Sequence, residues 1–158
     1  MLSRFFASRN LYCDDGVVHI RSFLDDPTQY LSWKSVEHCL TRDDVFWELI
    51  DKKGHKKNLQ QYKPYWSPVP CQDKNTIYEH IQNKESFVIT GYSKVNRKAN
   101  DLCIEIERSL DVNVDIHVYG GKGEAPSFKT HCDHFSNFII QCVGAVSYTH
   151  LRAHETIP

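Results

Sequence analysis

The stretch SFKTHCDHFSNFIIQCVG, residues 127–144, decides the expected fold and the expected site. Within it, His131 and Asp133 are separated by one residue, so in an extended segment both side chains leave the same face. An imidazole and a carboxylate on one face can occupy adjacent positions around a metal ion. A second His from another strand would complete the two-His, one-carboxylate set that holds non-heme iron(II). An HxD pair alone is weak evidence, whereas the longer pattern HxDxxxNFxxQxxG is more specific.

Periodic patterns upstream of this stretch predict the elements that lead into it. Residues 111–119 alternate apolar and polar side chains, which predicts a half-buried strand. Before them, residues 95–110 carry apolar side chains at steps of three and four, which predicts an amphipathic helix. The runs SFVIT, residues 86–90, and FIIQCV, residues 138–143, predict two apolar strands.

The first half of the chain is less legible. Residues 17–23 predict a short strand, and Asp26 followed by Pro27 predicts the start of a helix over residues 27–40. A capping-box pattern, TxxE at residues 76–79, predicts a helix through Lys84. Residues 41–74 predict no clear element. Their lysines indicate a solvated face, and the aromatic turn KPYWSPVP either packs over the core or covers a substrate cleft.

The pattern at residues 131–144, placed after this order of elements, resembles the JmjC-type cupins. This family of iron(II) and 2-oxoglutarate dependent hydroxylases includes the asparaginyl hydroxylase acting on hypoxia-inducible factor and bacterial ribosomal-protein hydroxylases. The resemblance implies a mainly β domain with a helical lead-in (α+β), containing part of a double-stranded β-helix. It implies that the protein hydroxylates a substrate carbon, most readily a side chain of a protein or peptide.

The resemblance also assigns roles to individual residues. His131 and Asp133 align with the first two iron ligands, and Asn137 aligns with an asparagine near 2-oxoglutarate. The threonine expected three residues before the first ligand is Phe128 here, although Thr130 could take its place in binding the co-substrate. The third ligand and the basic residue for the distal carboxylate of 2-oxoglutarate would follow Gly144.

The end of the chain is expected to have a different origin from the rest. Residues 146–156, VSYTHLRAHET, resemble the translation of a sequencing adapter, so His150 and His154 are expected to carry no chemistry. The chain then divides into a lead-in at residues 1–85, the first part of a barrel at 86–145 and an artefact at 146–158. Without the later ligands, this fragment is expected to be inactive.

Composition excludes several other classes of protein. The formal net charge is -1 and the pI is near 6.7, which argues against a nucleic-acid binder. No apolar run approaches the length of a membrane span or forms a secretory signal, and the six cysteines form no CxxC pair. We therefore expect a cytoplasmic protein with reduced thiols. The alternative to the hydroxylase is a non-catalytic cupin that binds or scaffolds; an isomerase-type cupin fits less well because Asp133 replaces its second His.

Overall fold

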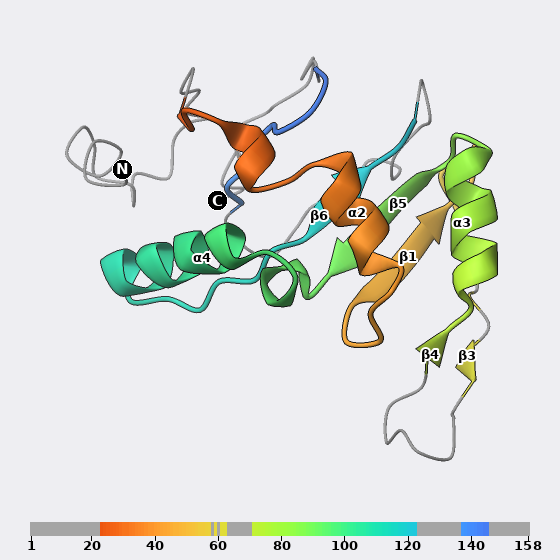
Figure 1. Cartoon of the computed structure of the whole chain (residues 1–158), viewed down its shortest axis with the longest axis horizontal. Helices are drawn as coiled ribbons and strands as arrows, with labels where there is room; N and C mark the ends of the chain where they lie inside the picture. The colour runs from red at the N-terminus through yellow and green to blue at the C-terminus, as the bar shows by residue number, and fades with distance from the viewer. Residues whose placement is uncertain (1–22, 58, 60, 63–70, 123–136, 146–158) are drawn as a thin grey trace, which may run out of the picture.

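The computed structural model describes residues 23–57, 59, 61–62, 71–122 and 137–145. They form an α+β fold with one four-stranded antiparallel sheet in the order β2-β1-β5-β6 (Figure 1). The strands of this sheet are β1 (Phe46–Ile50), β2 (Lys56–Lys57), β5 (Ser86–Thr90) and β6 (Val118–Gly120). A separate pair consists of β3 (Gln61–Tyr62) and β4 (Cys71–Gln72). The predicted α+β class is confirmed at this coarse level.

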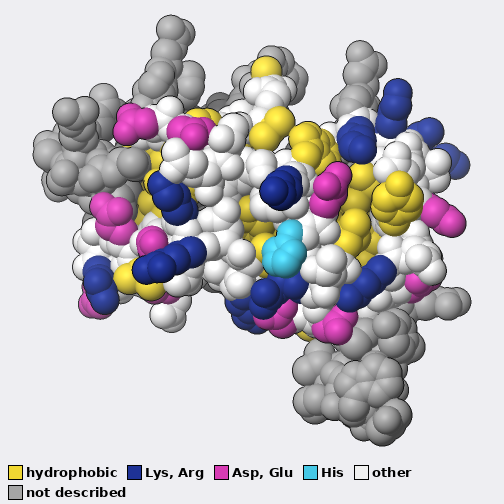
Figure 2. Space-filling model, viewed as in Figure 1, with side chains coloured by type: hydrophobic (Ala, Val, Ile, Leu, Met, Phe, Trp, Pro, Cys, Tyr) yellow, Lys and Arg dark blue, Asp and Glu magenta, His cyan; other side chains and the backbone are white. Residues whose placement is uncertain are grey.

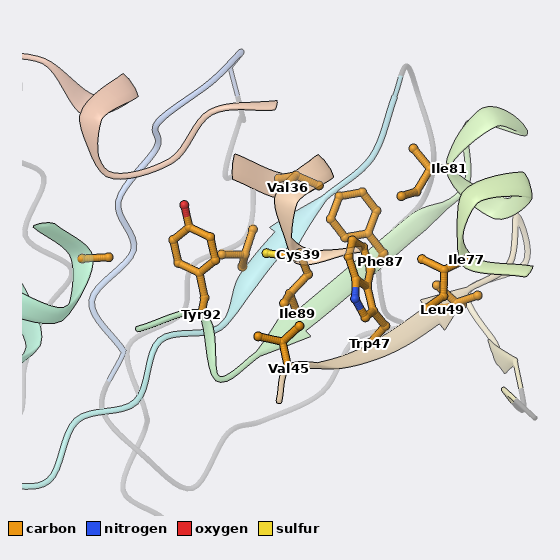
Figure 3. Packing of buried hydrophobic residues seen from close by; sticks show 12 residues of the cluster. Val36, Cys39, Val45, Trp47, Leu49, Ile77, Ile81, Phe87, Ile89 and Tyr92 are labelled. Carbon is orange, nitrogen blue, oxygen red and sulfur yellow. The ribbon is translucent and has the colours of Figure 1, made fainter. Parts of the chain in front are cut away.

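Strand β5 is central to the sheet, and its prediction from SFVIT is confirmed at both ends. It pairs along its whole length with β1 and over three residues with β6. Phe87 and Ile89 lie on one face, beside Leu49 and Trp47 of β1. Helices α2 (Trp33–Cys39) and α3 (Lys74–Gln82) contribute side chains to the same apolar cluster (Figure 3). Burial on a face and pairing on both edges together explain why this apolar run is a strand.

Strand β1 lies in the stretch where the sequence predicted no clear element. Its signal was present, because Val45, Trp47 and Leu49 alternate and all three are buried. The run is short and is followed at once by a lysine-rich turn, which obscured it. The Gln72 side chain forms hydrogen bonds with the backbone of β1. Its amide oxygen accepts from the Trp47 backbone N–H at 2.7 Å, and its amide nitrogen donates to the Trp47 carbonyl at 2.8 Å. The lead-in is therefore not purely helical, and the sheet takes strands from both sides of residue 85.

The single helix predicted over residues 27–40 is wrong. It is divided into a 3₁₀ turn, Pro27–Gln29, capped by Asp26 as expected, and α2. Ser32 ends the continuity because it adopts an extended conformation and caps α2, exchanging hydrogen bonds with Ser35. The Tyr92 hydroxyl donates to the Tyr30 carbonyl at 2.8 Å, which fixes the break against the core.

Helix α3 begins earlier than the TxxE pattern predicted. Its N-cap is Asp73, whose carboxylate accepts from the Asn75 backbone N–H at 3.1 Å and from the Thr76 hydroxyl at 2.6 Å. Thr76 is thus a first-turn residue that supports the cap rather than the cap itself. An Asp three residues before a Thr was the signal for this start.

Helix α4 (Arg97–Leu110) confirms the helix predicted over residues 95–110. Asn96 caps it by accepting from the Ala99 backbone N–H at 3.0 Å. Its buried face is the predicted apolar stripe, joined by Cys103. Leu102 and Ile106 form the centre of a second apolar cluster. Its partly buried members are Phe23, Tyr30, Leu110, Val114 and Ile140.

The two strands predicted after α4 fare differently. In the residues before β6 the alternation holds, since Val114, Ile116 and Val118 are more buried than their neighbours, but only Val118–Gly120 forms a ladder. Beyond Ile89, β5 turns away at Gly91 and offers no partner to residues 112–117. The strand predicted over residues 138–143 is wrong: no strand is present between residues 137 and 145 of the described chain.

No helix in the described ranges combines the length and apolar character needed to cross a membrane.

Candidate functional site

The residues predicted to hold iron fall mostly outside the described chain. His131 and Asp133, the expected ligands, and Thr130, an expected contact of 2-oxoglutarate, belong to residues 123–136, which the structure does not describe. Asn137 is described, and it is exposed at the start of the C-terminal segment. The mutual geometry of these four residues therefore stays a prediction.

The described residues on either side of this segment are anchored to different clusters. Before it, β6 brings Gly120 against the ring of Phe87, and the Lys122 ammonium lies 5.5 Å from the centre of the Trp33 ring. After it, Ile140 packs against Leu102 and Ile106 of α4. The described residues before the HxD pair therefore contact the main core, and Ile140 after it contacts the second cluster.

A largely buried polar cluster in the described chain consists of His80, Glu85 and Lys57. His80 lies in the last turn of α3 and is 2% exposed. Its Nδ1 lies 2.9 Å from Glu85 Oε2, and its Nε2 lies 2.8 Å from the Ser86 carbonyl oxygen. The Lys57 ammonium of β2 reaches the same Glu85 oxygen at 2.6 Å. One carboxylate therefore ties a helix and two strands together.

The electrostatics of this cluster favour an ionised Glu85. Burial raises the pKa of Glu85, but the hydrogen bond from Lys57 and the charges of His80 and Lys57 outweigh it, so the pKa lies below the usual value of 4.5. Both ring nitrogens of His80 face oxygen atoms, which leaves neither nitrogen available to a ligand. The cluster is an anchor for the start of β5 rather than an acid–base pair facing a substrate.

Sequence reasoning missed this cluster, although one signal was present. Ile77, His80 and Ile81 follow helical spacing on one face of α3, and all three are buried. A His between two core positions indicates a buried imidazole that needs polar partners. Nothing in the local sequence indicated that Lys57, which is 28 residues before Glu85, would share them.

Three described cysteines, Cys39, Cys103 and Cys142, are poorly suited to act as nucleophiles. Burial raises the pKa of Cys39 and of Cys103 to about 11, and it raises the pKa of Cys142 as well. These thiols are free, and Cys39 and Cys103 are buried, as the prediction of small reduced core residues required. At neutral pH they are protonated, so thiolate chemistry is not favoured.

Neither a hollow between β1 and α3 nor a depression at the end of α4 indicates a small-molecule site. The hollow between β1 and α3, lined by Trp47, Gln72 and Ile77 among others, has a volume near 10 Å³, about that of one water molecule. The larger depression at the end of α4, beside Arg108 and Asp111, is open to solvent. Within the described ranges, no group of three His, Cys, Asp or Glu side chains could hold a metal ion.

Comparison with known proteins adds no relative. No protein-family model, no curated protein and no solved structure matches the chain. Function must therefore be argued from the residue pattern and from the described fold.

Proposed function

We propose that this chain belongs to an iron(II) and 2-oxoglutarate dependent dioxygenase of the cupin type, which hydroxylates a carbon of a protein or peptide side chain. The observation that carries the proposal is the pattern HxDxxxNFxxQxxG at residues 131–144. In the facial arrangement typical of such oxygenases, one His and one carboxylate from an HxD pair bind the metal with a second His.

The described fold supports the proposal in a limited way. Strand β5, helix α4 and strand β6 follow one another as the resemblance expects, and β6 pairs antiparallel with β5. Antiparallel strands of this kind are the building units of a double-stranded β-helix. The described residues alone make an α+β sheet, and the cupin assignment remains part of the proposal.

In this proposal the residues of the chain would bind the metal ion and orient the co-substrate. His131 and Asp133 supply two of three metal ligands, while Asn137 and Thr130 contact 2-oxoglutarate. Iron(II) with 2-oxoglutarate and oxygen supplies the oxidising chemistry when bound. Strand β6, which precedes this segment in the chain, is held by the buried sheet centred on Phe87 and Ile89.

The test uses the protein encoded by the full-length gene. Succinate formation from 2-oxoglutarate should require iron(II). His131→Ala and Asp133→Ala should abolish it and should also weaken iron(II) binding measured by equilibrium dialysis. Asn137→Ala should bind iron(II) normally and lose about a few-fold to a hundred-fold in use of 2-oxoglutarate, the effect of one lost hydrogen bond.

Two outcomes would overturn the proposal. Unchanged turnover in Asp133→Ala would remove the carboxylate from the metal site. A wild-type protein that binds iron(II) but converts no 2-oxoglutarate with any peptide would favour the non-catalytic cupin, a binding or scaffold domain. Recovery of the gene downstream of Ala145 would show independently whether a His and a basic residue follow.

A further inference from the structure

One end of each of the four strands β1, β2, β5 and β6 lies at the same end of the sheet. Ile50, the last residue of β1, is paired with Ser86 at the start of β5 and with Lys56 at the start of β2. Gly120, the last residue of β6, is paired with Phe87. The turn at residues 51–55, the link before β5 and the residues after β6 therefore lie together at this end, beside α3 (Figure 1).

Basic side chains are concentrated at this end. The lysines on these segments are Lys52, Lys53, Lys56, Lys57, Lys84 and Lys122. The nearby carboxylates are Asp51, Glu85 and Glu48, which lies two residues before the end of β1. Figure 2 shows Lys and Arg side chains gathered at the end of the molecule where α3 and the sheet meet. The cluster is local, because the whole chain has a formal net charge of -1.

Most of these lysines have no carboxylate partner among the described residues. Lys56 pairs with Glu48 at 2.7 Å and Lys57 pairs with Glu85 at 2.6 Å. Over the described residues, no carboxylate lies within ion-pair distance of the other lysines of the group. These are Lys52, Lys53, Lys84 and Lys122. The positive charge at this end is therefore only partly neutralised within the described chain.

The carboxylates of Asp51 and Glu85 accept hydrogen bonds from the backbone of the turn and do not pair with the ammonium groups of Lys52 and Lys53. Asp51 Oδ1 accepts from the backbone N–H groups of Lys53 and His55 at 2.8 and 2.9 Å, which fixes the turn. Glu85 accepts from the Lys52 backbone N–H as well as from the Lys57 ammonium. The ammonium groups of Lys52 and Lys53 thus project from an ordered turn, and less backbone entropy is lost when a partner binds them.

We propose that this lysine-rich end of the sheet is a docking surface for an acidic segment of a protein partner. Exposed lysines at a fixed spacing attract a run of Asp and Glu side chains and accelerate association. A nucleic-acid partner is less well matched, because such proteins extend a basic stripe over a domain of high pI, whereas this chain has a pI near 6.7. The proposal uses none of the residues of the proposed oxygenase site and does not depend on that activity.

The test measures fluorescence anisotropy of a labelled oligoglutamate peptide titrated with the chain at about 50 mM salt, where surface charges are weakly screened. The triple variant Lys52→Glu, Lys53→Glu, Lys84→Glu should bind roughly ten- to a hundred-fold more weakly. The control variant Arg97→Glu, Lys98→Glu, Arg108→Glu makes the same change of charge at exposed positions of α4, away from this end, and it should lose less than about threefold.

Two further arms separate the alternatives. The neutral variant Lys52→Gln, Lys53→Gln, Lys84→Gln should show an intermediate loss, and it tests the surface with a smaller perturbation if charge reversal disturbs folding. Equal losses in the test and control triples would overturn the proposal, since they would indicate a general charge effect. Binding of an oligothymidylate of equal charge more tightly than oligoglutamate would overturn the protein partner in favour of a nucleic acid.

Discussion

Residues 86–90 and 138–143 have similar sequences, SFVIT and FIIQCV, and both were predicted to be apolar strands. The first is the central strand of the sheet, with Phe87 and Ile89 almost fully buried. The second forms no strand, and its Phe138 and Ile139 are 44% and 65% exposed. The difference is the presence of neighbours: β5 has β1 and β6 on its edges, whereas residues 138–143 pair with no strand in the described chain. An apolar run therefore gains stability as a strand only where other segments supply the opposite half of its hydrogen bonds and a cover for its face.

The sharpest test of this contrast replaces one phenylalanine in each run. The Phe87 ring lies between two tryptophans, with its centre 6.3 Å from that of Trp33 and 5.3 Å from that of Trp47. Phe87→Ala should lower the free energy of unfolding by about 3 to 5 kcal/mol, because the cavity is enclosed. Phe138→Ala should lower it by only about 1 kcal/mol, because this side chain is 44% exposed. Urea unfolding of both variants measures the difference, and similar values would mean that the two runs are equally packed.

Substitutions at two glycines distinguish the energetic cost of crowding in the packed region from that of backbone strain in the C-terminal segment. A Cβ on Gly120 would lie 2.5 Å from Phe87 Cζ, so Gly120→Ala should cost about 1 to 3 kcal/mol through displacement of the buried ring. Gly144 has a φ of +75°, and among the described residues, its chain neighbours aside, no atom lies within 4 Å of an added Cβ, so Gly144→Ala should cost about 1 kcal/mol through the strain of a left-handed residue. Thermal unfolding compares them, and a larger effect at Gly144 would contradict the contrast.

The ionised carboxylate at the start of β5 should make the stability of the packed region depend on pH. The folded-state pKa of Glu85 is lowered, so its contribution is complete above the usual value of 4.5 and is lost as pH falls through the folded pKa. Glu85→Gln should cost about 1 to 3 kcal/mol at pH 7 and less at low pH, because His80 and Lys57 lose a buried anionic partner.

Urea unfolding at a series of pH values from neutral to acidic measures this effect. The exposed Glu79→Gln variant serves as the control and should follow the wild type at every pH. If Glu85→Gln and the wild type differed by the same amount at all pH values, the role of the carboxylate's charge would be refuted.

The smallest expected effect lies within the C-terminal segment itself. Ile140 packs partly against Leu102 and Ile106, whereas the neighbouring Ile139 is mostly exposed. Ile140→Ala should therefore cost about 1 kcal/mol and Ile139→Ala close to zero, from the difference in buried apolar area. Chemical denaturation of the two variants checks whether residue 140 is the attachment point of this segment. Equal effects would indicate that the segment packs differently from this description.

The residues that the sequence placed correctly depend on local patterns. SFVIT is apolar enough to be a strand wherever it pairs, the stripe on residues 95–110 defines one helix face, and Asp26 before Pro27 defines a helical start. The HxD pattern at His131 and Asp133 likewise supports a hypothesis of chemistry from sequence alone. These signals are local because propensity, capping and periodicity act within a few residues.

Only the tertiary structure decided which segments pair and which charges meet. Strand β1 became recognisable through its ladder with β5, β6 is short because β5 ends at Thr90, and residues 138–143 form no strand because no strand of the described chain pairs with them. In the same way, Lys57 of β2 and His80 of α3 both contact the carboxylate of Glu85, which lies just before β5. Such contacts join residues far apart in the chain, and their free energy depends on neighbours that no local pattern specifies.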